Sequence, residues 1–343
     1  MKYNRKKYNK VLPRKKFVFN KDLLKASTWA ILLAEILLWM LCSCEQKDLC
    51  YNHDHASNVT VDFDWSKSPE ANPSSMLLFL FPRQEGEYLL KKEFIGKQGG
   101  NILARVGVDY SALGFNSNVR NLYIYQNGNE IEAHAKSASV LDRLGLLVSD
   151  IPQASGTEYQ RVVMEPDSLW SAVSDRDISI SLEENDNGEI YNLKLYPEKR
   201  FCTYTVKIKN VANVGSLSAS VAGSLSGQAG GVSLMDGTRT SEDVIVTFPF
   251  QLTKENALEG QFNSFGCSVN SNLPNKLVVY TVLKDDTKWS YVYDVTDQVR
   301  NAPDPYHIEI VLDKLPIPNR IENNSGFVPG VNDWTVIEIP VPM

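Results

Sequence analysis

The stretch Val59-Thr60-Val61-Asp62-Phe63-Asp64-Trp65 alternates strictly between apolar and polar side chains. Side chains two residues apart lie on the same face of a strand, so this pattern predicts a β-strand with one buried face. Met76 to Phe81 is instead a continuous apolar run that ends at Pro82, which is typical of a strand buried on both faces. Both patterns favour a β-rich fold.

Similar signals continue along the chain. Leu122 to Tyr125 precedes Asn127-Gly128, which predicts a strand followed by a tight turn. About seven short strands in each half, separated by turn signals, predict an all-β protein of two tandem β-sandwich domains. In the second half the expected strands are Tyr204–Ile208, Val244–Phe250, Lys276–Leu283 with its hairpin partner Trp289–Val295, and Ile308–Leu312.

The pattern pauses at Tyr196-Pro197-Glu198-Lys199-Arg200. Pro197 cannot donate a ladder hydrogen bond, so a linker or a strand edge is favoured there over a central strand. We therefore expect an N-terminal sandwich at residues 59–198 and a C-terminal sandwich at residues 199–343.

Four local expectations complete the secondary structure. Apolar residues at helical spacing make Ala138–Val148 the best helix candidate, and Pro166–Val173 is a candidate for a second helical turn. Strands on either side of Asp186-Asn187-Gly188 predict a hairpin over residues 178–195. The last strand, Thr335–Val341, either pairs internally or projects outward, and its alternation favours internal pairing.

The composition describes an ordinary globular protein, with 343 residues, 43% hydrophobic and 22% charged. Residues 1–43 hold ten Lys/Arg and two acidic residues, so the remainder has 25 basic and 39 acidic residues and a net charge of −14. That balance excludes the basic footprint that nucleic-acid binding requires, and it disfavours electrostatic docking on an anionic membrane.

The N-terminus combines a basic segment with the apolar run Ala26–Leu41, which is interrupted only by Ser27, Thr28 and Glu35. A run of roughly 16 residues is short for a membrane span but suits the core of a signal peptide. Glu35 further disfavours a span, because an acidic group there costs about 2.5–3.5 kcal/mol on insertion scales.

The run closes with Leu41-Cys42-Ser43-Cys44, which resembles a bacterial lipobox. The resemblance implies that residues 1–43 are a lipoprotein signal peptide and that Cys44 is lipidated, with acyl chains that anchor the protein in a membrane. Residues 44–58 would then form a polar tether. The alternatives are a signal peptide whose cysteines are incidental and an uncleaved signal anchor, and Cys42 leaves the modified cysteine open.

No pattern of catalytic or metal-binding residues stands out. Cys50, His53, Asp54 and His55 are the only cluster of soft ligands, but no further Cys/His pair supplies the remaining ligands, so we expect no metal and no cofactor. Catalytic motifs are also missing, and we expect no enzyme. Disulfides among Cys50, Cys202 and Cys267 stay open.

Two further features could carry function. Trp289, Tyr291 and Tyr293 share a strand face, which suits either a carbohydrate platform or a sandwich core, and core is favoured. Asp167-Ser168-Leu169 resembles the acceptor of the general O-glycosylation system of Bacteroidetes, which makes Ser168 a possible O-glycosylation site.

Further motifs accompany the lipobox: Leu49-Cys50-Tyr51 with His53 and His55, Val59–Trp65, Cys202–Val206, Lys209-Asn210-Val211, Ser224–Gly227, Phe265-Gly266-Cys267, Asp294–Val299, and Gly326-Phe327 to Asp333-Trp334. Together these motifs resemble a Bacteroidetes lipoprotein family catalogued as a domain of unknown function, similar to fimbrillin-associated anchor and minor subunits.

That resemblance implies two transthyretin-like or Ig-like sandwiches and a fimbrial anchor or accessory subunit at the cell surface. It would be held in outer-membrane lipid through Cys44 and joined to fimbrial subunits by strand addition. The alternative is a surface glycan-binding lipoprotein of a nutrient-uptake system. Exposed aromatic side chains outside the core would favour the alternative.

Overall fold

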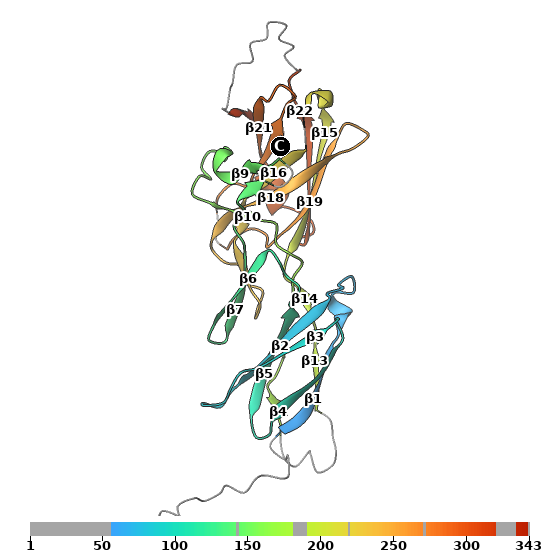
Figure 1. The fold of residues 1–343 in the computed structure, drawn as a ribbon, viewed down its shortest axis with the longest axis vertical. Helices are drawn as coiled ribbons and strands as arrows, with labels where there is room; N and C mark the ends of the chain where they lie inside the picture. The colour runs from blue at the N-terminus through green and yellow to red at the C-terminus, as the bar shows by residue number, and fades with distance from the viewer. Residues whose placement is uncertain are drawn as a thin grey trace, which may run out of the picture. The chain divides into compact units, whose positions relative to one another are not determined.

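The computed structural model describes residues 56–141, 144–180, 191–218, 220–269, 272–319 and 334–341. By its internal contacts the chain divides into Met1–His53 and Asp54–Met343, and the fold below belongs to the second unit. Strands dominate it (Figure 1). No helix of the described residues is long and apolar enough to span a membrane.

Two sheets enclose the first core. One has the order β13-β1-β4 and consists of β13 (Tyr191–Leu195), β1 (Ala56–Phe63) and β4 (Gly99–Arg105). The other has the order β14-β11-β5-β2-β3 and consists of β14 (Glu198–Lys199), β11 (Trp170–Val173), β5 (Asp109–Asn116), β2 (Ser75–Pro82) and β3 (Leu90–Ile95), with β12 (Ile178–Ser179) also on β5. Val61, Phe63, Leu78 and Leu80 lie in the apolar cluster between them, which makes this part a β-sandwich.

A nine-stranded sheet builds the second core. Its strands in order are β22 (His307–Leu315), β15 (Cys202–Val211), β19 (Leu258–Ser264), β18 (Asp243–Leu252), β16 (Val221–Ala229), β20 (Lys276–Val282), β21 (Lys288–Asp294) and β23 (Trp334–Ile339), with β10 (Arg161–Met164) on β18. Tyr204, Phe262, Tyr291 and Ile310 from both ends of the sheet share one apolar cluster, so the sheet folds over on itself.

Small elements complete the fold. A three-stranded sheet contains β17 (Gly231–Ser233), β7 (Glu130–Ala135) and β6 (Leu122–Asn127), and a two-stranded sheet contains β8 (Val140–Leu141) and β9 (Leu146–Leu147). The helical turns are η1 (Trp65–Lys67), η2 (Val148–Asp150), η3 (Val214–Ser216) and α3 (Thr296–Arg300).

The main strand predictions are confirmed. β1 buries every second residue, and β2 is covered on both faces, since Leu78 belongs to the first core while Phe79 belongs to the second. β20 and β21 form the expected hairpin. β23 pairs with β21 in parallel, so the last strand pairs internally.

The helix predicted at Ala138–Val148 is wrong, because this segment holds the short strands β8 and β9. Gly145, with φ of +66°, turns the chain between the two strands in a conformation that a helix does not contain. The second helical turn, at Pro166–Val173, is also wrong, because β11 is extended and pairs with β5.

The hairpin predicted over residues 178–195 is wrong as well. β12 pairs with β5, whereas β13 pairs in parallel with β1, so the two strands belong to opposite sheets of the first sandwich. The predicted turn at Asp186–Gly188 lies outside the described residues.

Strands on both sides of Tyr196–Arg200 share sheets. β10 pairs with β18, and β7 pairs with β17, so the sheets interlock across that point of the chain. β1 begins at Ala56, inside the segment expected to be a tether. The division into domains at residues 198 and 199 stays a prediction.

Candidate functional site

The β6–β7 hairpin presents two tyrosines to solvent. The strand and the turn predicted here are confirmed, and Gly128 supplies the positive φ of +60° that the two-residue turn needs (Figure 1). Tyr123 and Tyr125 are 62% and 60% exposed, although tyrosine in a sandwich usually packs inward. An exposed aromatic pair on a regular strand indicates a contact surface.

The two faces of the hairpin differ in kind. On the inner face, Leu122, Ile131, Ala133 and Ala135 are buried in the second core. On the outer face, Tyr123 lies opposite His134 and Tyr125 lies opposite Glu132, and directly opposed residues of a ladder share a face. The inner face attaches the hairpin to the second core, and the outer face is exposed and available to bind a ligand. We call Tyr123, Tyr125, Glu132, His134 and Lys136 the tyrosine face.

Polar contacts order the tyrosine face. The His134 Nε2 atom lies 2.8 Å from Glu132 Oε2. The Lys136 ammonium lies 5.1 Å from the centre of the Tyr123 ring, a cation–π distance, and it also donates to the Arg120 carbonyl. These contacts restrain the rotamers on this face before any ligand arrives.

Gly231 on β17 makes room for the imidazole. A Cβ atom at this position would lie 2.7 Å from His134 Nδ1 and 2.7 Å from the Ala133 carbonyl oxygen, too close for either. Gly231 pairs with His134 in the ladder, so the ring lies against bare backbone.

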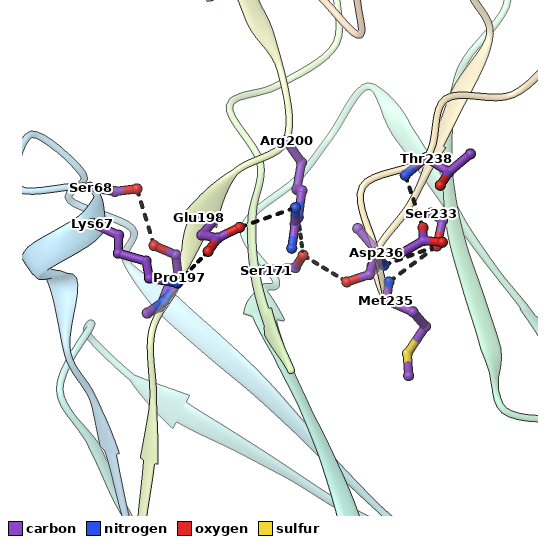
Figure 2. A network of polar contacts seen from close by, with 11 residues as sticks. Lys67, Ser68, Ser171, Pro197, Glu198, Arg200, Ser233, Met235, Asp236 and Thr238 are labelled. Atoms are coloured by element: carbon purple, nitrogen blue, oxygen red, sulfur yellow. Dashed lines mark hydrogen bonds and ion pairs between the residues drawn. The ribbon is translucent and has the colours of Figure 1, made fainter. Parts of the chain in front are cut away.

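A polar network holds β17 and the loop that follows it (Figure 2). Ser171 on β11, fully buried, donates from Oγ to the Leu234 carbonyl at 2.7 Å and accepts from Arg200 Nε at 2.6 Å. Arg200 Nη1 also lies 3.6 Å from Glu198, which is bound to Lys67 at 2.5 Å. β11, the end of β14 and the loop after β17 are thereby connected.

The loop itself is closed by local bonds. Ser233 Oγ accepts from the backbone N–H groups of Met235 and Asp236, at 3.3 and 3.4 Å, and Asp236 Oδ1 accepts from the N–H of Thr238 at 2.9 Å (Figure 2). The hydrogen bond from the Thr238 N–H, with a smaller contribution from the Ser233 side chain, lowers the pKa of the Asp236 carboxyl. The loop is therefore a rigid support for β17.

The outer edge of β6 has no strand partner among the described residues. Asn127 and Glu130 close the hairpin, so the backbone groups of Leu122, Ile124 and Gln126 point away from β7. β6 carries no charge and no proline, the devices that usually block edge pairing. The edge strand β3 differs, because it carries Lys91, Lys92 and Glu93.

The predicted lipidation site Cys44 lies outside the described residues, as do Cys50, His53 and His55. No group of three His, Cys, Asp or Glu residues in the described segments could hold a metal ion. His307 is exposed at the start of β22 and pairs with Asp304 at 2.9 Å.

Ser168, the possible O-glycosylation site, is half-buried between β10 and β11. Its Oγ accepts from Asn263 Nδ2 at 3.4 Å. Asp167 Oδ2 accepts the N–H groups of Arg120 and Asn121, both at 2.6 Å, and Leu169 is buried. The Asp and Leu of the motif therefore have structural roles, while modification of Ser168 stays a prediction.

The aromatic strand Trp289–Tyr293 belongs to the core, as expected. Tyr291 and Tyr293 are buried and donate to the carbonyls of Pro316 and Lys314, at 3.4 and 3.0 Å. Burial raises the pKa of Tyr291 to about 12. Tyr123 and Tyr125 are instead exposed on their strand. Alternation puts them on one face of that strand but does not show whether that face is buried.

Cys202 and Cys267 line a cavity of about 200 Å³ and form no disulfide in the described residues. Arg239 Nη2 lies 3.5 Å from Cys202 Sγ. Burial nevertheless raises the pKa of both thiols, so they are protonated at neutral pH and are poor nucleophiles.

A family model described as "Domain of unknown function (DUF5119)" matches residues 43–250. No curated protein sequence matches the chain. Among solved structures, a candidate adhesin from Bacteroides ovatus is similar at 19% identity, with a TM-score of 0.55, covering 80% of this chain and 99% of that one.

Two further structures are similar at lower scores. The fimbrial anchor protein Mfa2 from Porphyromonas gingivalis is 12% identical, with a TM-score of 0.45, and the match covers 75% of this chain and 90% of that one. A candidate adhesin from Bacteroides thetaiotaomicron is 12% identical, with a TM-score of 0.39 and coverage of 68% and 78%. The likeness to the candidate adhesin from Bacteroides ovatus, with its TM-score of 0.55, concerns the fold and agrees with the all-β prediction.

Proposed function

Since this chain belongs to the DUF5119 family, whose model covers more than half of it, we propose that it is a cell-surface protein of a fimbrial or adhesive assembly. Its part is to anchor the assembly or to serve as an accessory subunit, by binding and not by catalysis. The similarity of the fold to a candidate adhesin supports this role.

The observation that carries the proposal is the open, uncharged edge of β6. An edge strand with unpaired N–H and C=O groups is a template on which another chain can add a strand. Tyrosine and isoleucine also favour extended backbone, so the edge is held in the conformation that pairing requires. We assign the strand-addition site to Leu122–Asn127.

Membrane attachment is the second part of the proposal. Lipidation at Cys44 would place two or three acyl chains at the N-terminus, enough for stable anchoring where one chain is marginal. A lipidated N-terminus fits a base or accessory position better than that of a repeated polymer subunit, because it stays in the outer membrane.

Isolation of the tagged full-length protein from outer membranes, after cross-linking, tests the assembly role. Fimbrial subunits should be recovered with the wild-type protein and identified by mass spectrometry. Recovery of the protein alone, from cells that display fimbriae, would refute the proposed role.

A pair of variants tests the β6 edge. Gln126→Pro removes an N–H that points away from β7 and should reduce recovery of the partner roughly tenfold, the equivalent of one lost hydrogen-bonded contact. Gln126→Ala is the matched control, since it removes the side chain and keeps the N–H. Equal recovery with both variants would place the partner elsewhere.

A further inference from the structure

We propose that the tyrosine face of the β6–β7 hairpin binds a neutral polysaccharide. This site is separate from the β6 edge, because it uses side chains of the outer face and not the outward backbone groups. A strand added at the edge would extend the sheet and leave the rings uncovered.

The two rings offer a stacking surface. Tyr123 and Tyr125 are two residues apart on one strand, so their positions repeat at about 6.6–6.8 Å on one face. Each is at least 60% exposed. The face of an aromatic ring carries partial negative charge, and the C–H groups on one side of a pyranose ring are apolar and weakly positive. Stacking against a sugar ring therefore buries apolar surface and also brings the weakly positive C–H groups onto the negative face of the aromatic ring.

Hydrogen-bonding groups flank the rings. Glu132 lies opposite Tyr125, and His134 lies opposite Tyr123, with Nε2 and Oε2 2.8 Å apart. Since Nε2 donates to Oε2, the imidazole holds the carboxylate in place, and the second carboxylate oxygen, Oε1, can accept a hydrogen bond from a sugar hydroxyl. The side chains are 38% and 29% exposed, so both are accessible.

The charges favour a neutral ligand. Glu132 and Lys136 carry opposite charges, so they add no net charge to the face. An anionic ligand would meet Glu132, and a cationic ligand would meet Lys136. A polyhydroxylated chain without charge suffers neither repulsion.

A sugar also fits this face better than a protein does. Aliphatic side chains of the hairpin lie on the inner face, where Leu122, Ile131 and Ala133 are buried. The outer face therefore has rings and hydrogen-bonding groups but no aliphatic centre of the kind that protein interfaces bury. The face is also preorganised, since Lys136 restrains Tyr123 and Gly231 seats His134, which reduces the entropy lost on binding.

Affinity electrophoresis tests this inference, with the purified full chain run through gels that contain one neutral polysaccharide each: xylan, mannan, glucomannan, laminarin or dextran. We expect at least one gel to retard the wild-type protein. Tyr123→Ala combined with Tyr125→Ala should weaken binding about tenfold or more, as truncation of aromatic anchors does. The double Phe variant keeps the rings and should be retarded like the wild type.

The matched control is Tyr88→Ala with Tyr159→Ala, which removes two tyrosines that are 83% and 66% exposed but lie off the face. The inference would be overturned if this control abolished the retardation, or if the Ala variants of Tyr123 and Tyr125 left it unchanged. So would failure of all five gels to retard the wild-type protein. If the Ala pair instead abolishes a self-association seen by sedimentation, the face binds protein and the glycan assignment is wrong.

Discussion

Ser171→Ala tests whether the network around Arg200 stabilises the fold. Ser171 is fully buried, and its hydroxyl links Arg200 Nε to the Leu234 carbonyl through bonds of 2.6 and 2.7 Å. Alanine removes both bonds at once and adds nothing that could replace them. Arg200 lies only 3.6 Å from Glu198 and can shift toward it. The Leu234 carbonyl, in contrast, has no second donor in this network.

The expected cost follows from these contacts. A hydrogen bond to a charged group contributes about 1.5–3 kcal/mol, and a buried carbonyl without a donor costs about 1–3 kcal/mol. The two contributions overlap, so we expect the free energy of unfolding to fall by about 3 kcal/mol. For a chain of 343 residues, with an unfolding entropy of about 2.1 cal/mol/K per residue, that corresponds to a melting temperature lower by about 4 °C.

Urea unfolding followed by tryptophan fluorescence measures this change, with calorimetry for the melting temperature. Ser218→Ala is the matched control, because Ser218 Oγ also donates to a main-chain carbonyl, that of Val282, at 2.9 Å but is exposed. Its cost should stay below about 0.5 kcal/mol. If Ser171→Ala costs no more than Ser218→Ala, the network does not stabilise the fold and the reasoning fails.

Three further predictions concern other parts of the molecule. Burial raises the pKa of Tyr280 to about 12, so the folded state keeps a proton that the unfolded state loses above pH 10; unfolding free energy measured in urea should fall from pH 10 to 12, and less steeply in Tyr280→Phe. Gly231→Ala should lower the free energy of unfolding by about 1–3 kcal/mol in the same assay and weaken any polysaccharide retardation, because the new Cβ displaces the neighbouring imidazole. If neither quantity changes, Gly231 does not position His134. Metabolic labelling with an alkyne fatty acid should be abolished by Cys44→Ser and retained by Cys42→Ser, and the reverse result would move the lipidation site.

Local alternation carried most of the fold prediction. It predicted β1 and the β20–β21 hairpin because their apolar positions match the period of a strand, whereas β2 was predicted from a continuous apolar run, which fits its two buried faces. It could not predict which strands pair over long distances. The parallel pairing of β13 with β1 depends on the sandwich closing around both, and no feature within residues 178–195 encodes it.

The helix predicted at Ala138–Val148 was wrong for a different reason. Four apolar residues at helical spacing also fit two short strands when a glycine separates them, and Gly145 does so with a positive φ. Periodicity over so short a segment does not discriminate between these structures. The glycine was the signal that could have decided it, because glycine inside a helix is unfavourable.

The candidate site shows most clearly where sequence reasoning stops. Strand alternation places Tyr123 and Tyr125 on one face and Leu122 and Ile124 on the other, but both sets are apolar enough to be core. Only β7 decides, because Ile131 and Ala133 are buried while Glu132 and His134 are the partners of the two tyrosines. β7 alternates in the same way. Pairing the two strands through the Asn127-Gly128 turn would therefore have put the tyrosines beside the polar side chains of β7, which favours the solvent-facing side. The register of a hairpin thus contains information on exposure that neither strand contains alone. The same reasoning correctly predicts that Trp289–Tyr293, which pairs with the apolar strand β20, lies in the core.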